Sequence, residues 1–145
     1  MQINQSEILL AALVVAVGDS YTPVQLQKYM FLLDKNLPAS MGGPFFDFQP
    51  YDYGAFDPAV YDVAKRLASQ GLVLIDSNPG TPVRTYAPTS MGVERGNEIL
   101  SKINADISKY LRELSIWVRG MGFSELVSKV YQLYPETKVN SVFRG

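Results

Sequence analysis

The first apolar run of the chain has no polar face. It covers residues 8–17, and it follows Asn4 and Glu7, which have the spacing of a helix-capping box. A helix that is apolar all round is buried on every side. We therefore expect a central helix over 5–17 that ends at Gly18.

A second helix, over 23–36, has clear start and stop signals. Thr22 is placed to cap it, Pro23 suits its first position, Gln25 completes a capping box, and Pro38 follows its end. Its apolar face, at spacings of four and three, is Leu26, Met30, Leu33 and Leu37.

A third helix, over 58–70, begins with the same device of a cap followed by proline, Asp57 and Pro58, and ends at Gly71. Its apolar face is Val60, Ala64 and Leu67. Two short β-prone segments separated by a loop rich in Asn, Pro and Gly then predict a hairpin over about 72–88.

The last part of the chain predicts one long helix over 90–119 and a short one over 124–134, separated by the Gly-rich residues 120–123. The apolar stripe of the long helix is Leu100, Ile103, Ile107, Tyr110, Leu114, Trp117 and Met121. A stripe of about 30 residues is more than a small domain usually covers, so we expect part of it to form a homodimer contact.

The order helix, helix, helix, hairpin, long helix predicts a mainly α fold with a small β-hairpin, in a single winged-helix-like domain over 1–145. The segment around the hairpin resembles the wing of MarR-like and PadR-like regulators. Tyr86, Thr89 and Gly92 stand at the positions of their Tyr-x-Leu-Thr-x-x-Gly phrase, and Pro88 replaces the usual leucine.

Composition narrows the chemistry that the chain can support. It has 145 residues, 47% hydrophobic and 19% charged, with no Cys and no His. Zinc fingers, His-activated nucleophiles and disulfide frameworks are therefore excluded. The apolar run at 8–17 is too short to span a bilayer, and no basic region precedes it. We expect a cytoplasmic protein without a membrane span, catalytic residue, cofactor or metal.

The charge distribution leaves DNA binding open as an alternative function. Residues 1–62 have a net charge of −5, and residues 63–145 have a net charge of +4. If the third helix were a recognition helix, the residues expected to contact DNA would be Lys65, Arg66, Ser69 and Gln70 on that helix and Arg84 on the wing. Two features oppose this reading: residues 57–90 carry no net charge, and residues 38–57 far exceed a helix-turn-helix turn.

An aromatic and acidic segment precedes the third helix. Its aromatic residues are Phe45, Phe46, Phe48, Tyr51, Tyr53, Phe56 and Tyr61. The favoured interpretation is that Phe46, Phe48 and Tyr51 pack a loop onto the core and that Gly54 supplies a special backbone geometry. A partner-binding surface is the second interpretation. A metal site is the third, formed by acids at a spacing of five, Asp47, Asp52, Asp57 and Asp62.

Three phrases of the chain resemble the YwgA-like proteins and the related Panacea or SocA-like domain. They are an L-Q-K helix with Gln27 and Lys28, a turn with Tyr51, Tyr53 and Gly54, and a late Tyr-x-x-Tyr-Pro-Glu at 131–136. Ala55 stands where a proline is usual. The resemblance implies a non-enzymatic module that binds a protein partner, such as a toxin or defence component.

On that resemblance and on the aromatic turn, we predict a regulatory interaction module. Its contact surface would combine the turn with the exposed face of the third helix. The residues expected to bind the partner are Tyr51, Tyr53, Gly54 and Tyr61. The alternative remains a winged-helix transcriptional regulator.

Overall fold

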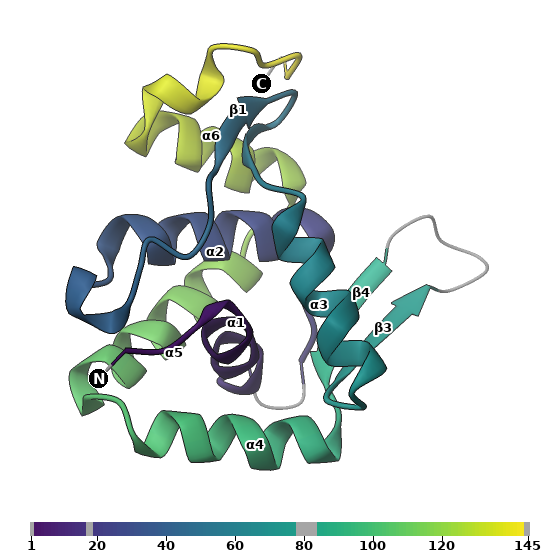
Figure 1. Cartoon of the computed structure of the whole chain (residues 1–145). Coiled ribbons are helices and arrows are strands. Elements are labelled where there is room, and N and C mark those ends of the chain that lie inside the picture. Colours follow the sequence, from purple (N-terminus) through teal and green to yellow (C-terminus); the bar gives the residue numbers. More distant parts are fainter. Residues whose placement is uncertain (1, 17–18, 78–83, 144–145) are drawn as a thin grey trace.

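The computed structural model describes residues 2–16, 19–77 and 84–143 (Figure 1). The helices are α1 (Gln5–Val14), α2 (Pro23–Asn36), α3 (Ala59–Ser69), α4 (Ser90–Ser101), α5 (Ala105–Arg119) and α6 (Phe123–Leu133), with short 3-10 helices η1 (Ala39–Met41) and η2 (Pro135–Lys138). The strands pair into two antiparallel hairpins, β1 (Gln49–Tyr51) with β2 (Gly54–Phe56), and β3 (Val73–Ser77) with β4 (Arg84–Pro88). The fold is mainly α with small hairpins, as predicted, although the β1–β2 hairpin was not predicted.

Helix α1 is the centre of the core, as its pattern predicts. Every residue from Ile8 to Val14 is buried, and the helix lies among α3, α4 and α5 (Figure 1). The predicted capping box is present, because Asn4 Oδ1 accepts from Glu7 N and Glu7 Oε1 accepts from Asn4 N. The helix ends at Val14, earlier than predicted, and Gly18 lies outside the described residues.

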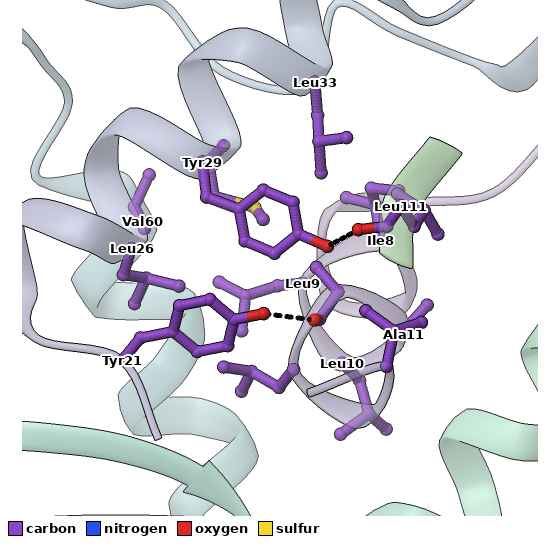
Figure 2. Packing of buried hydrophobic residues seen from close by; sticks show 14 of the residues in the cluster. Ile8, Leu9, Leu10, Ala11, Tyr21, Leu26, Tyr29, Leu33, Val60 and Leu111 are labelled. Atoms are coloured by element: carbon purple, nitrogen blue, oxygen red, sulfur yellow. Dashed lines mark hydrogen bonds between the residues drawn. The ribbon is translucent and has the colours of Figure 1, made fainter. Parts of the chain in front are cut away.

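Two tyrosines join α2 and its entry to the rest of the core (Figure 2). The Tyr29 hydroxyl donates to the carbonyl of Leu111 at 2.8 Å, and the Tyr21 hydroxyl donates to that of Ala12 at 3.0 Å. The rings stack 5.3 Å apart. Burial is the main cause that raises the pKa of both phenols. Buried tyrosines with satisfied hydroxyls thus tie α2 to α1 and α5.

The predicted long helix over 90–119 is wrong, because the chain breaks it into α4 and α5. Lys102 ends α4, Ile103 is buried in the turn, and Asn104 Oδ1 caps α5 by accepting from Asp106 N at 2.7 Å. The apolar spacing continues through the turn because both helices need a buried face. Helix α4 packs on α1 and α5 packs on α2 (Figure 1), so the argument for a homodimer through one long stripe loses its premise.

The predicted order of helix, hairpin and helix is present in α3, β3–β4 and α4. Helix α3 begins at Ala59, one residue later than predicted, so that Pro58 and not Asp57 is its N-cap residue, although Asp57 Oδ1 still accepts from Ala59 N at 2.9 Å. Thr89 caps α4 by accepting from Gly92 N at 3.0 Å and donates to the carbonyl of Gly71 at 2.6 Å. The hairpin tip, 78–83, lies outside the described residues.

The residues of the Tyr-x-Leu-Thr-x-x-Gly phrase, Tyr86, Thr89 and Gly92, therefore have structural roles at this junction. Tyr86 is buried and forms an antiparallel bridge with Tyr21, with both backbone hydrogen bonds at 2.9 Å. The Gly92 Cα lies so close to the carbonyl of Leu72 that a side chain there would overlap it.

Helix α6 begins and ends one residue earlier than predicted. Within the described ranges, no helix has the length and hydropathy needed to cross a membrane.

Candidate functional site

Helix α2 holds the β1–β2 hairpin through two buried polar side chains. The Gln27 amide donates to the carbonyl of Asp57 at 2.9 Å and accepts from Asp57 N at 3.0 Å. Lys28 Nζ donates to the carbonyl of Ala55 at 2.9 Å. These groups lie on or just beyond β2, whose only ladder partner is β1. The two side chains thus take the place of a further strand, because buried backbone groups need partners.

Gly54 is required at the turn of this hairpin. Its φ of +98° lies in the left-handed region, which L side chains rarely adopt. A Cβ added there would lie 2.9 Å from Tyr131 Cε1 and 3.4 Å from Lys28 Nζ. The prediction that this glycine supplies a special backbone geometry is confirmed.

A pocket of about 650 Å³ lies between this hairpin and three helices. It is bounded by the first two turns of α2, the hairpin, α3 and the residues that enter α6. In Figure 1 the hairpin and α6 lie together above α2. Most of its wall is apolar, and five aromatic side chains contribute to it: Tyr51, Tyr53, Phe56, Tyr61 and Phe123. Volume and lining are those of a ligand-binding pocket.

The rings of the wall contact one another edge to face. Tyr53 lies 5.0 Å from Phe123, Tyr51 lies 5.4 Å from Phe56, and Phe56 lies 5.7 Å from Tyr61, all between ring centroids. Tyr51 is nevertheless 49% exposed and Tyr53 46% exposed. The aromatic wall is therefore ordered by its own contacts while two of its rings still face solvent.

Lys28 also lines the pocket, although only 2% of its surface is exposed. Burial lowers the pKa of its amine to about 8, so that it is still mostly protonated at pH 7. Among the described residues, no Asp or Glu oxygen lies within the 4.0 Å of a salt bridge to Nζ. Nζ donates a hydrogen bond to the Ala55 carbonyl. Within the part of the chain that the structure describes, the pocket thus contains a buried positive charge without a counterion.

The four residues predicted to bind a partner all line this pocket, namely Tyr51, Tyr53, Gly54 and Tyr61. Tyr61 is half-buried, its hydroxyl donates to the Pro23 carbonyl at 3.3 Å, and burial is the main cause that raises its pKa to about 12. The interpretation that Tyr51 packs onto the core is wrong, because that ring is half exposed. Phe46 and Phe48 do pack against the core.

The pocket also contains four residues that were not predicted as site residues, Lys28, Phe56, Met121 and Phe123. The L-Q-K phrase singled out Lys28, but only as part of a resemblance and not as a pocket residue. Nothing local marks Met121 and Phe123, which reach the pocket because α6 packs against α2. Only the tertiary structure brings them beside the aromatic turn.

The proposed acidic metal site is not assembled. Asp57 uses both carboxylate oxygens on backbone N–H groups, those of Ala59 at 2.9 Å and of Asp47 at 2.8 Å. Across residues 2–16, 19–77 and 84–143, no three acidic side chains come close enough to hold a metal ion. The acids spaced by five are therefore distributed over a loop, a turn and a helix.

The predicted nucleic-acid residues lie elsewhere than the aromatic pocket. Lys65, Arg66 and Ser69 are exposed on α3, and the exposed C-cap residue Gln70 lines a second hollow of about 490 Å³ beside α1 and α4. Arg84 is exposed on β4, and its charge tends to lower the pKa of Tyr61. None of these five side chains lines the aromatic pocket. The chain thus has two separate candidate surfaces.

Comparisons with known families and with curated proteins found no match to this chain.

Proposed function

We propose that this protein is a non-enzymatic regulatory module that binds a protein partner through the aromatic pocket. The observation that carries the proposal is the combination of a 650 Å³ apolar pocket with two half-exposed tyrosines at its border. Tyrosine is enriched in protein interfaces because it gives a large contact area with a polar tip. Aromatic anchors that fill well-packed pockets dominate binding energy in such interfaces.

The polar groups around the pocket support binding rather than catalysis. Gln27 and Lys28 are hydrogen-bonded to the backbone of the hairpin. Asp34, further along α2 and outside the pocket lining, accepts from the backbone N–H groups of Phe45 and Phe46, and burial is the main cause that raises its pKa. These side chains hold the loop in place, and they do not form an acid–base pair with one another.

The class of partner follows from the resemblance to the Panacea and YwgA-like proteins. That resemblance supports a toxin or a defence-associated protein. Gln27 and Lys28 of the L-Q-K phrase support a role of the hairpin in binding, since they fix the hairpin that carries the tyrosines. The part of α3 around Tyr61, which lines the pocket, would widen the contact, whereas Lys65 lies outside it.

The test begins with a partner recovered from cells by affinity capture and then purified. Its dissociation constant is measured by isothermal titration with the wild type, with Tyr53→Ala and with Leu74→Ala. Leu74 is an exposed apolar residue on β3 that does not line the pocket, so it is the matched control. We expect Tyr53→Ala to weaken binding at least tenfold and Leu74→Ala to leave it unchanged. Equal affinity for all three proteins would reject the pocket as the contact.

DNA binding is the alternative outcome and has its own signature. Affinity for mixed-sequence duplex that falls steeply with salt, and is lost in Lys65→Glu, would assign the function to the α3 face. Protein binding through the pocket predicts that Lys65→Glu leaves affinity for the partner intact. The two variants therefore separate the two surfaces.

A further inference from the structure

The pocket combines an apolar wall with a positive charge that no acidic side chain of the described residues pairs with. Lys28 is the charged group, buried beneath the hairpin, and within the described residues its amine donates to one carbonyl, that of Ala55. A protonated amine can donate three hydrogen bonds. Burying a charge is costly unless it is paired, so a ligand that supplies an anion would gain from pairing with it.

Two helix N-termini add to the positive potential at the same place. Residues 22–25, at the start of α2, and residues 121–123, at the start of α6, both line the pocket. Thr22 caps α2, whereas the N-cap residue of α6 is Gly122, which has no side chain to accept from the first-turn N–H groups. Free N–H groups and the helix dipole favour an anion at such an end. Lys28 and the two helix N-termini therefore all favour the binding of an anion in the pocket.

The pocket does not suit a ligand with many negative charges. Asp52 lines it from the exposed turn of the hairpin and would repel a polyanion. Most of the remaining wall is aromatic or aliphatic, so it favours an apolar group beside one anion. The C-terminal residue of a polypeptide has both features on one Cα, an apolar side chain and a free carboxylate.

We propose that the pocket captures the C-terminal carboxylate of the partner polypeptide, with Lys28 as the residue that pairs with it. This inference rests on the proposed function, because it names the part of the partner that enters the pocket. The last side chain of the partner would be apolar and would contact Tyr53 and Phe123. Capture of a C-terminal carboxylate is an established mode of peptide recognition.

The first experiment uses synthetic peptides and the unmodified protein. Fluorescein-labelled hexapeptides ending in Phe, Leu or Val are prepared as free acids and as C-terminal amides, and binding is measured by fluorescence polarisation at pH 7. We expect at least one free acid to bind tenfold or more tightly than its amide. Equal binding of acid and amide, or no binding of any free acid at millimolar protein, would overturn the inference.

The second experiment assigns the effect to Lys28. In Lys28→Met the tenfold preference for the free acid should disappear, while Lys129→Met, which removes an exposed lysine of α6 outside the pocket, should keep it. Circular dichroism checks that both variants are folded. A Lys28→Met protein that is folded and still prefers the acid would contradict the assignment.

A pH titration of the wild type keeps the test valid if Lys28→Met does not fold. Because its pKa is about 8, Lys28 loses its proton over pH 7–9.5, and the acid should lose its advantage over the amide there. The other titratable groups that line the pocket or contact Gly54 are Tyr51, Asp52, Tyr53, Tyr61 and Tyr131. The amide peptide meets the same groups and serves as the reference. A constant ratio of affinities over this range would overturn the inference.

Two further results separate this inference from the proposed function. A purified partner that needs Tyr53 but binds equally well after residues are added to its C-terminus would reject C-terminal capture and leave the partner-binding proposal standing. A small acid such as 3-phenylpropanoate that displaces the free-acid peptide at equal concentration would assign the pocket to a free carboxylic acid instead.

Discussion

The core around α1 and the pocket end of the molecule are held together in different ways. In the core, apolar side chains from α1 meet those of neighbouring helices, and two tyrosine hydroxyls supply the polar links. At the pocket end, buried polar side chains of α2 hold a short hairpin by its backbone. The first region depends on area removed from water, and the second on a few directed hydrogen bonds.

The difference explains why the second region can serve recognition. The hairpin is fixed from below by Gln27 and Lys28, so its tyrosines do not have to be buried to keep it in place. Tyr51 and Tyr53 can therefore remain exposed at a pocket whose geometry is already set. A binding surface that is ordered before the partner arrives loses less entropy on association.

The largest expected effect is on the core. Leu13→Ala should lower the free energy of unfolding by roughly 4 kcal/mol, because Leu13 is fully buried within the central helix and its surroundings cannot collapse onto the cavity. Chemical denaturation followed by circular dichroism measures it. Leu133→Ala, at an exposed position of α6, should change stability by less than about 0.5 kcal/mol. Equal effects would mean that burial at α1 does not dominate stability.

The next largest effect is on the pH dependence of stability, to which the buried Lys28 at the pocket contributes. The pKa of Lys28 is about 8 in the folded protein, whereas the ordinary value for a lysine, which applies to the unfolded chain, is 10.5. Between these two pH values the unfolded chain therefore binds more protons than the folded protein. The contribution of this lysine to stability must then rise with pH across that window, by at most about 3 kcal/mol. The measurement is the stability of the wild type relative to Lys28→Met at pH 7, 8, 9 and 10.

Comparison with that variant removes the contribution of the tyrosines. Tyr21, Tyr29 and Tyr61 have raised pKa values, so the folded protein keeps their protons and stability falls as pH rises above about 10. Both proteins share that loss. A stability difference that stays flat from pH 7 to 10 would contradict a desolvated Lys28.

A smaller effect concerns the turn of the hairpin. Gly54→Ala should destabilise by roughly 2 kcal/mol, because it combines a positive φ with a contact to Tyr131. Gly71→Ala is the matched control, since Gly71 also has a positive φ, but nothing lies within 4 Å of an added Cβ there. It should cost about 1 kcal/mol. Thermal denaturation of both variants tests the contact with Tyr131 directly, and identical losses would exclude it.

The smallest effect on stability is expected from the side chain that pairs with Asp57. Gln27→Leu removes two hydrogen bonds and leaves two backbone groups to find other partners, so it should cost about 1 kcal/mol or somewhat more. Amide hydrogen exchange should show the loss concentrated in residues 49–57. The exposed Gln132→Leu is the control. Uniform loss of protection over the whole chain would argue that Gln27 belongs to the core and not to the hairpin.

The sequence predicts the core better than the pocket, for a physical reason. Helix periodicity and caps are local, so Asn4 and Thr22 were predicted as caps and the structure confirms both. Thr89 also caps a helix, α4, although it was not predicted to do so. The turn at 102–104 was missed because the apolar spacing continues through it. The β1–β2 hairpin was missed because its partners are side chains of α2, almost 30 residues away in the chain.

The pocket could be predicted only in part. The aromatic turn was identified as a recognition surface, and its four residues do line one pocket. Lys28 and Phe123 reach the same place from other helices, and no spacing rule relates them to the turn. Such contacts depend on how α6 packs against α2, which a single sequence does not encode locally.

The most direct test of the central claim compares hydrogen–deuterium exchange in the protein alone and bound to its purified partner. If the aromatic pocket is the recognition site, protection should increase in residues 49–56 and 121–125. Protection that increases only in residues 65–70 and 84–88, with the pocket segments unchanged, would contradict the account and place recognition on α3 and β4.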